Sequence, residues 1–89
     1  MRAVITVIGQ DKVGIIAGVS GILAECSVNI LDISQTIMQD VFTMIMLVDF
    51  GTSTMSNDSI KQQLQAFGES KDVQIHIQHE NLFNAMHRI

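Results

Sequence analysis

The fold of this chain is decided by residues 9–31, which read GQDKVGIIAGVSGILAECSVNIL. The preceding residues, AVITVI at 3–8, are rich in β-branched side chains, as is typical of a strand. A short polar turn at 10–12 then leads into an apolar segment that carries three glycines. This pattern predicts a central strand, a turn, and a helix that begins near Val13 or Gly14, followed by a second strand.

The predicted helix is apolar on nearly every side. Ser20 and Glu25 are its polar side chains, and Gly14, Gly18 and Gly21 fall on one flank. Each glycine inside a helix lowers the stability of the helix by about 1 kcal/mol relative to alanine, so the presence of these glycines requires an explanation. Either the helix packs closely on its own sheet, or a second subunit approaches it. One sheet covers only one side of a helix, which favours a partner. Six residues are placed to face the sheet: Ile15, Ile16, Val19, Ile22, Leu23 and Cys26.

The second strand is predicted at residues 28–38, where apolar and polar side chains alternate. Its apolar face, with Leu31, Ile33 and Ile37, is expected to belong to the core. A tight connection joins it to a third strand at 42–50, which is apolar on both faces. The two strands therefore predict a hairpin.

The second half of the chain predicts one more helix and one more strand. Ser56 is a good N-cap for an amphipathic helix that ends between Gly68 and Lys71. The alternation from Val73 to Ile77 indicates a strand with one apolar face, placed at a sheet edge. The order β-α-β-β-α-β predicts an α+β, ferredoxin-like fold, with two helices on one face of a four-stranded antiparallel sheet.

The tail at residues 80–89 predicts a short C-terminal helix with one apolar stripe. Because so short a helix is not stable alone in water, we expect it to dock on the second face of the sheet. It could dock on its own subunit or on a neighbour. We expect residues 1–79 to form one domain, with the tail as an attached docking helix. The stripe consists of Leu82, Phe83, Met86 and Ile89.

Composition narrows the classes of function. The 89 residues are 47% apolar, and only five are Lys or Arg, which leaves a net charge of −4. We therefore expect neither nucleic acid nor an anionic membrane surface as a partner. A single cysteine rules out an internal disulfide and fits a reducing compartment. The longest apolar run, 13–24, is too short to span a bilayer, and no signal peptide is apparent, so we expect a cytoplasmic protein.

Catalytic and metal chemistry find little support in the sequence. Ser20 has no histidine near it, and Cys26 is expected to be a small buried apolar residue rather than a nucleophile. The histidines are His76, His79 and His87. On a strand, His76 and His79 fall on opposite faces, so surface histidines are favoured over a metal site. We expect no catalytic residue, no metal and no cofactor.

The first turn carries the one combination of residues that predicts a ligand. Backbone amides at the start of a helix attract a carboxylate, and Gly14 permits close approach because it has no side chain. Asp11 could meet an ammonium group, and Asn29 offers both a donor and an acceptor. Together they predict a site for a free amino acid. The simpler interpretation, with Asp11 as a helix cap and Gly14 and Asn29 as turn residues, stays open.

Several of these segments resemble the ACT domain. They are GQDKVGI at 9–15, the apolar helix, VNI at 28–30 and FTM at 42–44 after the hairpin turn. The resemblance covers about residues 3–79. It is closest to ACT domains in glycine-cleavage-system regulators and formyltetrahydrofolate deformylases. With its terminal NAMHRI at 84–89, the chain looks like the small stand-alone ACT proteins of bacteria.

The resemblance implies a regulatory, non-enzymatic domain that binds an amino acid and works as a homodimer or larger homo-oligomer. In such dimers the sheets join side by side, and the ligand lies between one subunit's first loop and the partner's second strand. Asp11 matches the polar contact of that loop, Gly14 its glycine, and Asn29 the strand asparagine of serine-binding members. Gly9 departs from those members, which have a histidine there, and this puts serine itself in question.

The resemblance thus predicts two sets of residues. The expected ligand contacts are Asp11, Lys12, Val13, Gly14, Ile15 and Asn29. The expected interface contacts are Gly18, Gly21 and Ile30. An alternative is a protein-interaction module without a small ligand, suggested by the excess apolar surface of the first helix and of the first and third strands. A regulated protein partner is compatible with either function.

Overall fold

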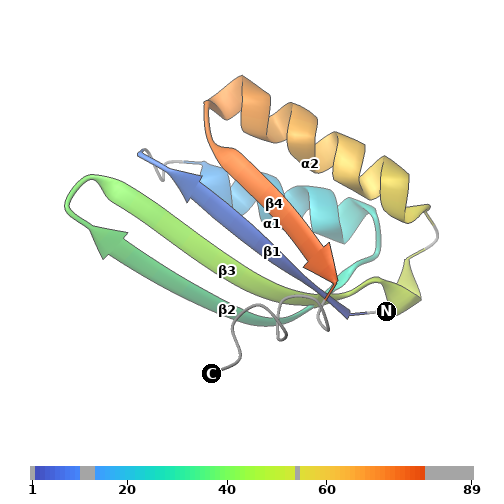
Figure 1. Cartoon of the computed structure of the whole chain (residues 1–89). Helices are drawn as coiled ribbons and strands as arrows, with labels where there is room; N and C mark the ends of the chain where they lie inside the picture. Colours follow the sequence, from blue (N-terminus) through green and yellow to red (C-terminus); the bar gives the residue numbers. More distant parts are fainter. Residues whose placement is uncertain (1, 11–13, 54, 80–89) are drawn as a thin grey trace.

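The computed structural model describes residues 2–10, 14–53 and 55–79. They form a four-stranded antiparallel sheet with two α-helices on one face, which is the predicted ferredoxin-like fold (Figure 1). The elements are β1 (Arg2–Gly9), α1 (Ile15–Glu25), β2 (Asn29–Met38), β3 (Val41–Asp49), the 3-10 helix η1 (Phe50–Thr52), α2 (Asn57–Lys71) and β4 (Gln74–His79).

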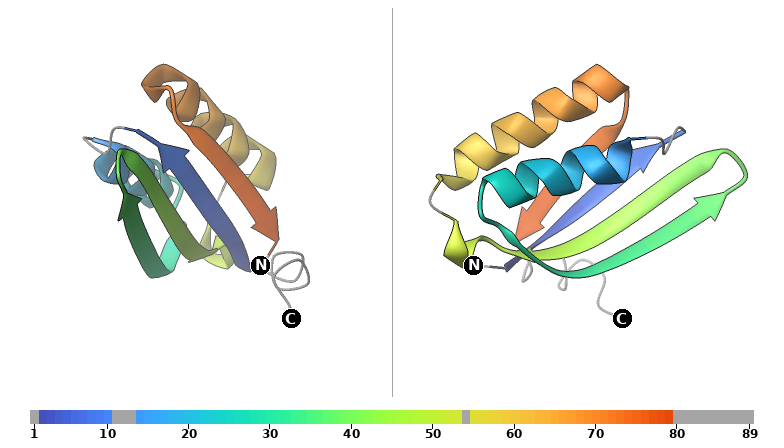
Figure 2. Two further views of the ribbon diagram at one scale, coloured as in Figure 1. Left: turned by 60° about the vertical axis from the view of Figure 1, so that its left-hand side comes forward. Right: turned by 180° about the vertical axis from the view of Figure 1, so that it is seen from behind.

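The strand order is β2-β3-β1-β4, so β1 and β3 are central and the other two strands are the edges. The central position of β1 and the edge position of β4 confirm the sequence predictions. Alternate residues of each strand point to opposite faces, and the register shows which residues share a face. Both helices lie behind the sheet in Figure 1 and in front of it in the reversed view of Figure 2.

The core lies between the sheet and the helices. All side chains that are buried within the described residues are apolar. The face of α1 that we predicted to meet the sheet does so: four of its six residues are buried, and Ile16 and Ile22 pack against the core partly buried. The most enclosed side chains come from every layer: Ile5, Val7, Ile15, Val19, Leu23, Phe42, Met44, Met46, Val48, Ile60 and Leu64.

The glycines of α1 have different surroundings. A side chain on Gly18 would overlap the ring of Phe67, so this glycine lets α1 and α2 pack closely together. We expected close packing on the sheet or on a second subunit, and the structure instead shows packing on the second helix of the same chain. Beside Gly21, no described atom lies within 4 Å of the place a Cβ would take. That glycine therefore has open space next to it.

The strand β2 does not form the core face that its alternation predicts. Ile33 and Ile37 do share the helix side of the sheet with their β3 partners Met46 and Phe42, but they are 39% and 54% exposed. Leu31 lies at a β-bulge and is 44% exposed. The prediction of burial was wrong because no described helix packs over this part of β2, whereas α2 covers the other edge strand, β4. The β2–β3 hairpin extends beyond the two helices (Figure 2), and no described helix covers this part of it.

The predicted helix ends are close to those observed. The α1 helix begins at Ile15, one or two residues later than expected. The Ser56 hydroxyl accepts a hydrogen bond from the Ser59 amide at 3.2 Å, which confirms the predicted cap of α2. That helix ends at Lys71, within the predicted range, and no described helix is long and apolar enough to cross a membrane. The tail at 80–89 lies outside the described residues.

Candidate functional site

The amino end of α1, where the ligand contacts were predicted, begins at Gly14. Gly14 occupies the N-cap position with φ of 77°, a left-handed conformation that glycine adopts without strain. No side-chain hydrogen bond from the described residues caps this end. Asp11, Lys12 and Val13 lie outside the described residues, so the proposed contacts from these three side chains stay predictions.

The amides of the first turn of α1 point out of this end of the helix. The first helical hydrogen bond runs from the Gly18 amide to the Gly14 carbonyl at 2.9 Å. The amides of Ile15, Ile16 and Ala17 come before it and have no acceptor within the helix. Such amides, together with the helix dipole, attract an anion. The Ile15 side chain is only 1% exposed and belongs to the core, so its predicted ligand contact could come only from its main chain.

Asn29 lies at the other end of α1 from Gly14. It is exposed and begins β2, directly after the turn that follows the helix. An α-helix rises 1.5 Å per residue, so the helix of 11 residues separates the two positions by roughly 16 Å. A single chain therefore does not bring Gly14 and Asn29 to one small ligand.

The predicted interface residues differ in their surroundings. Gly18 packs against the ring of Phe67 in the same chain, and Ile30 is half-buried against the core. Gly21 lies on an exposed strip of α1 made of small residues. Sequence analysis missed the rest of this exposed apolar surface, because the edge position of β2 is needed to recognise it. Its members are Ala17, Gly21 and Ala24 on α1, with Leu31, Ile33 and Ile37 on β2.

Gly9, where the resemblance led us to expect a histidine, packs closely against another part of the chain. A Cβ at this position would overlap the side chain of Val73, which precedes β4. The end of β1 therefore packs directly against Val73, and no side chain fits between them.

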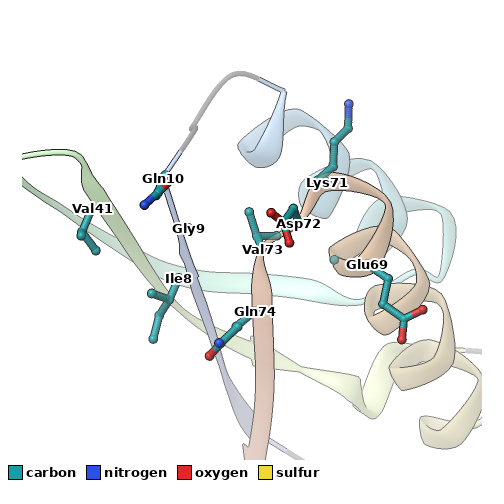
Figure 3. Close-up of a pocket in the computed structure, with 10 residues that line it drawn as sticks. Ile8, Gly9, Gln10, Val41, Glu69, Lys71, Asp72, Val73 and Gln74 are labelled. Atoms are coloured by element: carbon teal, nitrogen blue, oxygen red, sulfur yellow. The ribbon is translucent and has the colours of Figure 1, made fainter.

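A surface cavity of about 620 Å³ lies at the end of β1 near this loop (Figure 3). Its lining is apolar at Ile8, Val41 and Val73 and polar at its margin. The Lys71 and Glu69 side chains point in different directions away from Gly9 in Figure 3, so their charges do not converge on one point. The other lining residues are Gly9, Gln10, Gly68, Asp72 and Gln74.

Reactive side chains are scattered in the part of the chain that the structure describes. Cys26 is a free, fully buried cysteine, as predicted. The register places His76 beside Thr6 and His79 beside Ala3, on opposite faces of the sheet, which also agrees with the sequence. The described residues contain no group of three His, Cys, Asp or Glu side chains that could hold a metal ion.

Among the described residues, the carboxyl group of Asp49 has a shifted pKa. The Gly51 amide donates a hydrogen bond of 2.8 Å to Asp49, and this lowers the pKa of the Asp49 carboxyl from its usual value of 3.8. Asp49 ends β3 and pairs with Asn29, so the bond lies beside the start of the edge strand β2.

Comparison with known proteins agrees with this geometry. Residues 2–78 match the family described as the ACT domain. A UPF0237 protein of Clostridium acetobutylicum is 61% identical over 89 residues, with all of both chains covered. The chain belongs to the ACT-domain family. ACT domains are regulatory ligand-binding domains, often amino-acid binding and oligomeric.

Solved ACT-domain structures share the fold. An ACT domain protein from Streptococcus pneumoniae aligns with a TM-score of 0.79 and 43% identity, covering 93% of each chain. A putative glycine cleavage system transcriptional repressor aligns with a TM-score of 0.73 and 26% identity, covering 86% of this chain and 44% of the other. Formyltetrahydrofolate deformylases share the fold at 24% identity or less. The predicted resemblance is thus confirmed.

Proposed function

We propose that this ACT domain is a non-enzymatic regulatory domain that binds a free amino acid between two copies of itself in the cytoplasm. The proposal rests on the separation of two groups that lie at opposite ends of α1. The first-turn amides that follow Gly14 and the exposed amide side chain of Asn29 are about 16 Å apart in one chain. Two antiparallel copies of the helix would bring each Gly14 to the partner's Asn29 position, completing two equivalent sites.

The chemistry of each half matches one end of an amino acid. The α-carboxylate would accept hydrogen bonds from the first amides of α1, and Asp11 would hold the ammonium group. Asn29 from the other copy can donate and accept, so it suits either group. Lys12 and Val13 lie in the same loop and would line the site. Because Gly9 has no side chain, we expect a preference different from that of serine-binding relatives.

The exposed surface beside α1 supports a second copy as the partner. An edge strand leaves backbone donors and acceptors unpaired, and natural edge strands usually carry charges or prolines that prevent pairing. From Leu31 to Met38, β2 instead carries exposed apolar side chains together with one charged residue, Asp32. The small residues Ala17, Gly21 and Ala24 would allow two α1 helices to approach closely. Pairing of β2 with β2 would also extend the sheet across both copies.

Ligand binding at such an interface would stabilise the paired form, because only the pair contains both halves of the site. Regulation would follow from this change in association. Isothermal titration calorimetry against the twenty amino acids tests the binding. Heat from one amino acid or a few related ones is expected, and its complete absence would count against the proposal.

Complementation between variants tests whether the site is shared. Asp11→Ala and Asn29→Ala should each abolish binding, because each removes one half of both sites. A mixture of the two variants should recover binding, since mixed dimers contain one intact site. The matched controls Asp40→Ala and Gln62→Ala, both at exposed positions, should bind normally. Lack of recovery in a mixture that forms mixed dimers would contradict a shared site.

A second candidate function is a protein-interaction module without a small ligand. The exposed Ile33 and Ile37 favour it, because the same β2 edge could pair with a strand of another protein. Affinity purification distinguishes the two functions. One stoichiometric protein partner, together with no amino-acid binding, would support this candidate over the first.

A further inference from the structure

The face of the sheet without helices carries an apolar stripe that is two strands wide. The register places side chains of β1 and β3 next to one another along this face. We call this set the helix-free stripe: Val4, Thr6 and Ile8 on β1 with Thr43, Ile45 and Leu47 on β3. Polar residues flank it on both sides: Asp32, Ser34 and Thr36 on β2, and Gln74, His76 and Gln78 on β4.

Exposure is uneven along the helix-free stripe. Ile8 and Ile45 are each 37% exposed, so the stripe presents apolar surface to water. Val4 is only 5% exposed, although both described helices lie on the opposite face of the sheet. Its neighbours across the strands, Leu47 and Gln78, are half-buried. The end of the stripe near Val4 is therefore the more enclosed end.

The dimensions of the stripe fit one helix. Neighbouring strands lie about 4.8 Å apart, so a two-strand stripe with its side chains is roughly as wide as a helix of about 10 Å diameter. A second sheet packed face to face would be wider and would bury the polar flanks on β2 and β4. Burying those groups without partners is unfavourable. A single helix is therefore a better occupant than the same face of a second copy.

We propose that residues 80–89 of the same chain form this helix and cover the helix-free stripe. The strand β4 ends at His79, which pairs with Ala3, so the tail leaves the sheet beside Val4. The tail carries apolar residues at helical spacing: Leu82, Phe83, Met86 and Ile89. A short connection at 80–81 is enough to turn the chain onto this face.

The length of the tail determines how much of the helix-free stripe it can cover. A helix over 82–89 is about 12 Å long, and the strand segment from Val4 to Ile8 is about 13 Å. The tail thus reaches along the stripe but stops before the hairpin end. Val41 and Met38, at 41% and 69% exposure, stay uncovered. Covering the stripe would block stacking between sheets and direct self-association to the β2 edge.

A pair of matched variants tests whether the tail covers the helix-free stripe. In the full-length protein, Phe83→Asp places a charge on the apolar side of the tail, whereas the control Asn84→Asp adds the same charge on its other side. We expect Phe83→Asp to raise the fluorescence of a bound hydrophobic dye several-fold and to speed hydrogen exchange in β1. Asn84→Asp should leave both unchanged. Equal behaviour of the two variants would overturn the proposal.

Disulfide trapping identifies which copy supplies the tail. Ile45→Cys with Met86→Cys should oxidise to a bond within one chain, seen as a monomer band on a non-reducing gel. Ala17→Cys with Met86→Cys is the control, because Ala17 lies on the helix side and should not bond. A dimer band from the first pair would assign the tail to a neighbouring copy and overturn the proposal, as would bonding in the control alone.

Discussion

The two edge strands of the sheet have similar sequence patterns but different surroundings. In β4 and the residue before it, the apolar side chains Val73 and Ile75 are 9% and 4% exposed. In β2, Ile33 and Ile37 are 39% and 54% exposed, although they also point to the helix side. The difference comes from α2, which packs on β4. The Gln65 side-chain Nε2 on α2 also donates a hydrogen bond of 2.8 Å to the Ile75 carbonyl. The alternation of apolar and polar residues therefore predicts which face of the sheet a side chain lies on. Whether that side chain is buried depends on whether a helix packs over it.

The largest effect should come from truncating the same residue type on both edges. Ile75→Ala should lower the free energy of unfolding by about 2–5 kcal/mol, because it leaves a cavity under α2. Ile33→Ala should change it by only about 0.5 kcal/mol in the monomer, since its side chain already contacts water. Urea titration at a concentration low enough to give monomers measures both. Equal losses would show that β2 is as well covered as β4.

The next effect concerns the contact that joins α1 to α2. Gly18→Ala should destabilise the fold by about 1–3 kcal/mol, because the added methyl overlaps Phe67. Gly21→Ala is the matched control on the same helix. It should stabilise the monomer by up to about 1 kcal/mol, since its surroundings are open. Thermal unfolding measures both variants.

The pair also reports on the proposed dimer. If Gly21 lies against a second copy, Gly21→Ala weakens association while it stabilises the isolated chain. A Gly18→Ala variant that is as stable as the parent would contradict the close α1–α2 contact.

A charge on the β2 edge should separate association from folding. We expect Ile37→Asp to abolish dimers in sedimentation velocity, because it places a carboxylate in the proposed interface. The free energy of unfolding of the monomer should change by only about 0.5 kcal/mol, as for other exposed positions. His76→Asp on β4 carries the same charge on the opposite edge and should still dimerise. Loss of dimers in both variants would show that the effect is not specific to β2.

The smallest effect is the pH dependence from Asp49. Its carboxyl has a lowered pKa in the folded chain, mainly because it accepts the Gly51 amide hydrogen bond. The folded state therefore binds this proton less readily than the unfolded state, whose pKa is near 3.8. The contribution to stability is complete above that value and is lost as the pH falls through the folded pKa. Asp49→Asn should flatten the acid side of the stability curve slightly, as followed by urea titration between neutral and acidic pH.

Local patterns were sufficient to predict most of the fold. β-branched runs, the alternation from Val73 and the Ser56 cap gave the order of elements, because these signals act between near neighbours in sequence. The burial of Ile33 and Ile37 was predicted wrongly, because it depends on how far the helices extend over the sheet. The contact between Gly18 and Phe67 was likewise missed, since it joins residues far apart in the chain.

The candidate site was predictable only in part. The glycine at position 14 and the asparagine at position 29 are readable from the sequence, and the structure adds that α1 holds them apart. The core position of Ile15 was predicted from helical spacing, while its ligand contact rested on family resemblance alone. The apolar helix suggested a partner, but which residues a second copy would contribute depends on the assembly, and one sequence does not determine that.

The packing of Gly9 against Val73 has a consequence for related sequences. The two positions are far apart in the sequence, yet in the fold they share one space that holds a single side chain. A relative with a large residue at position 9 should therefore carry a small residue at position 73, or shift the start of β4. This pair of positions then offers a simple way to sort ACT domains by the kind of first loop they can build.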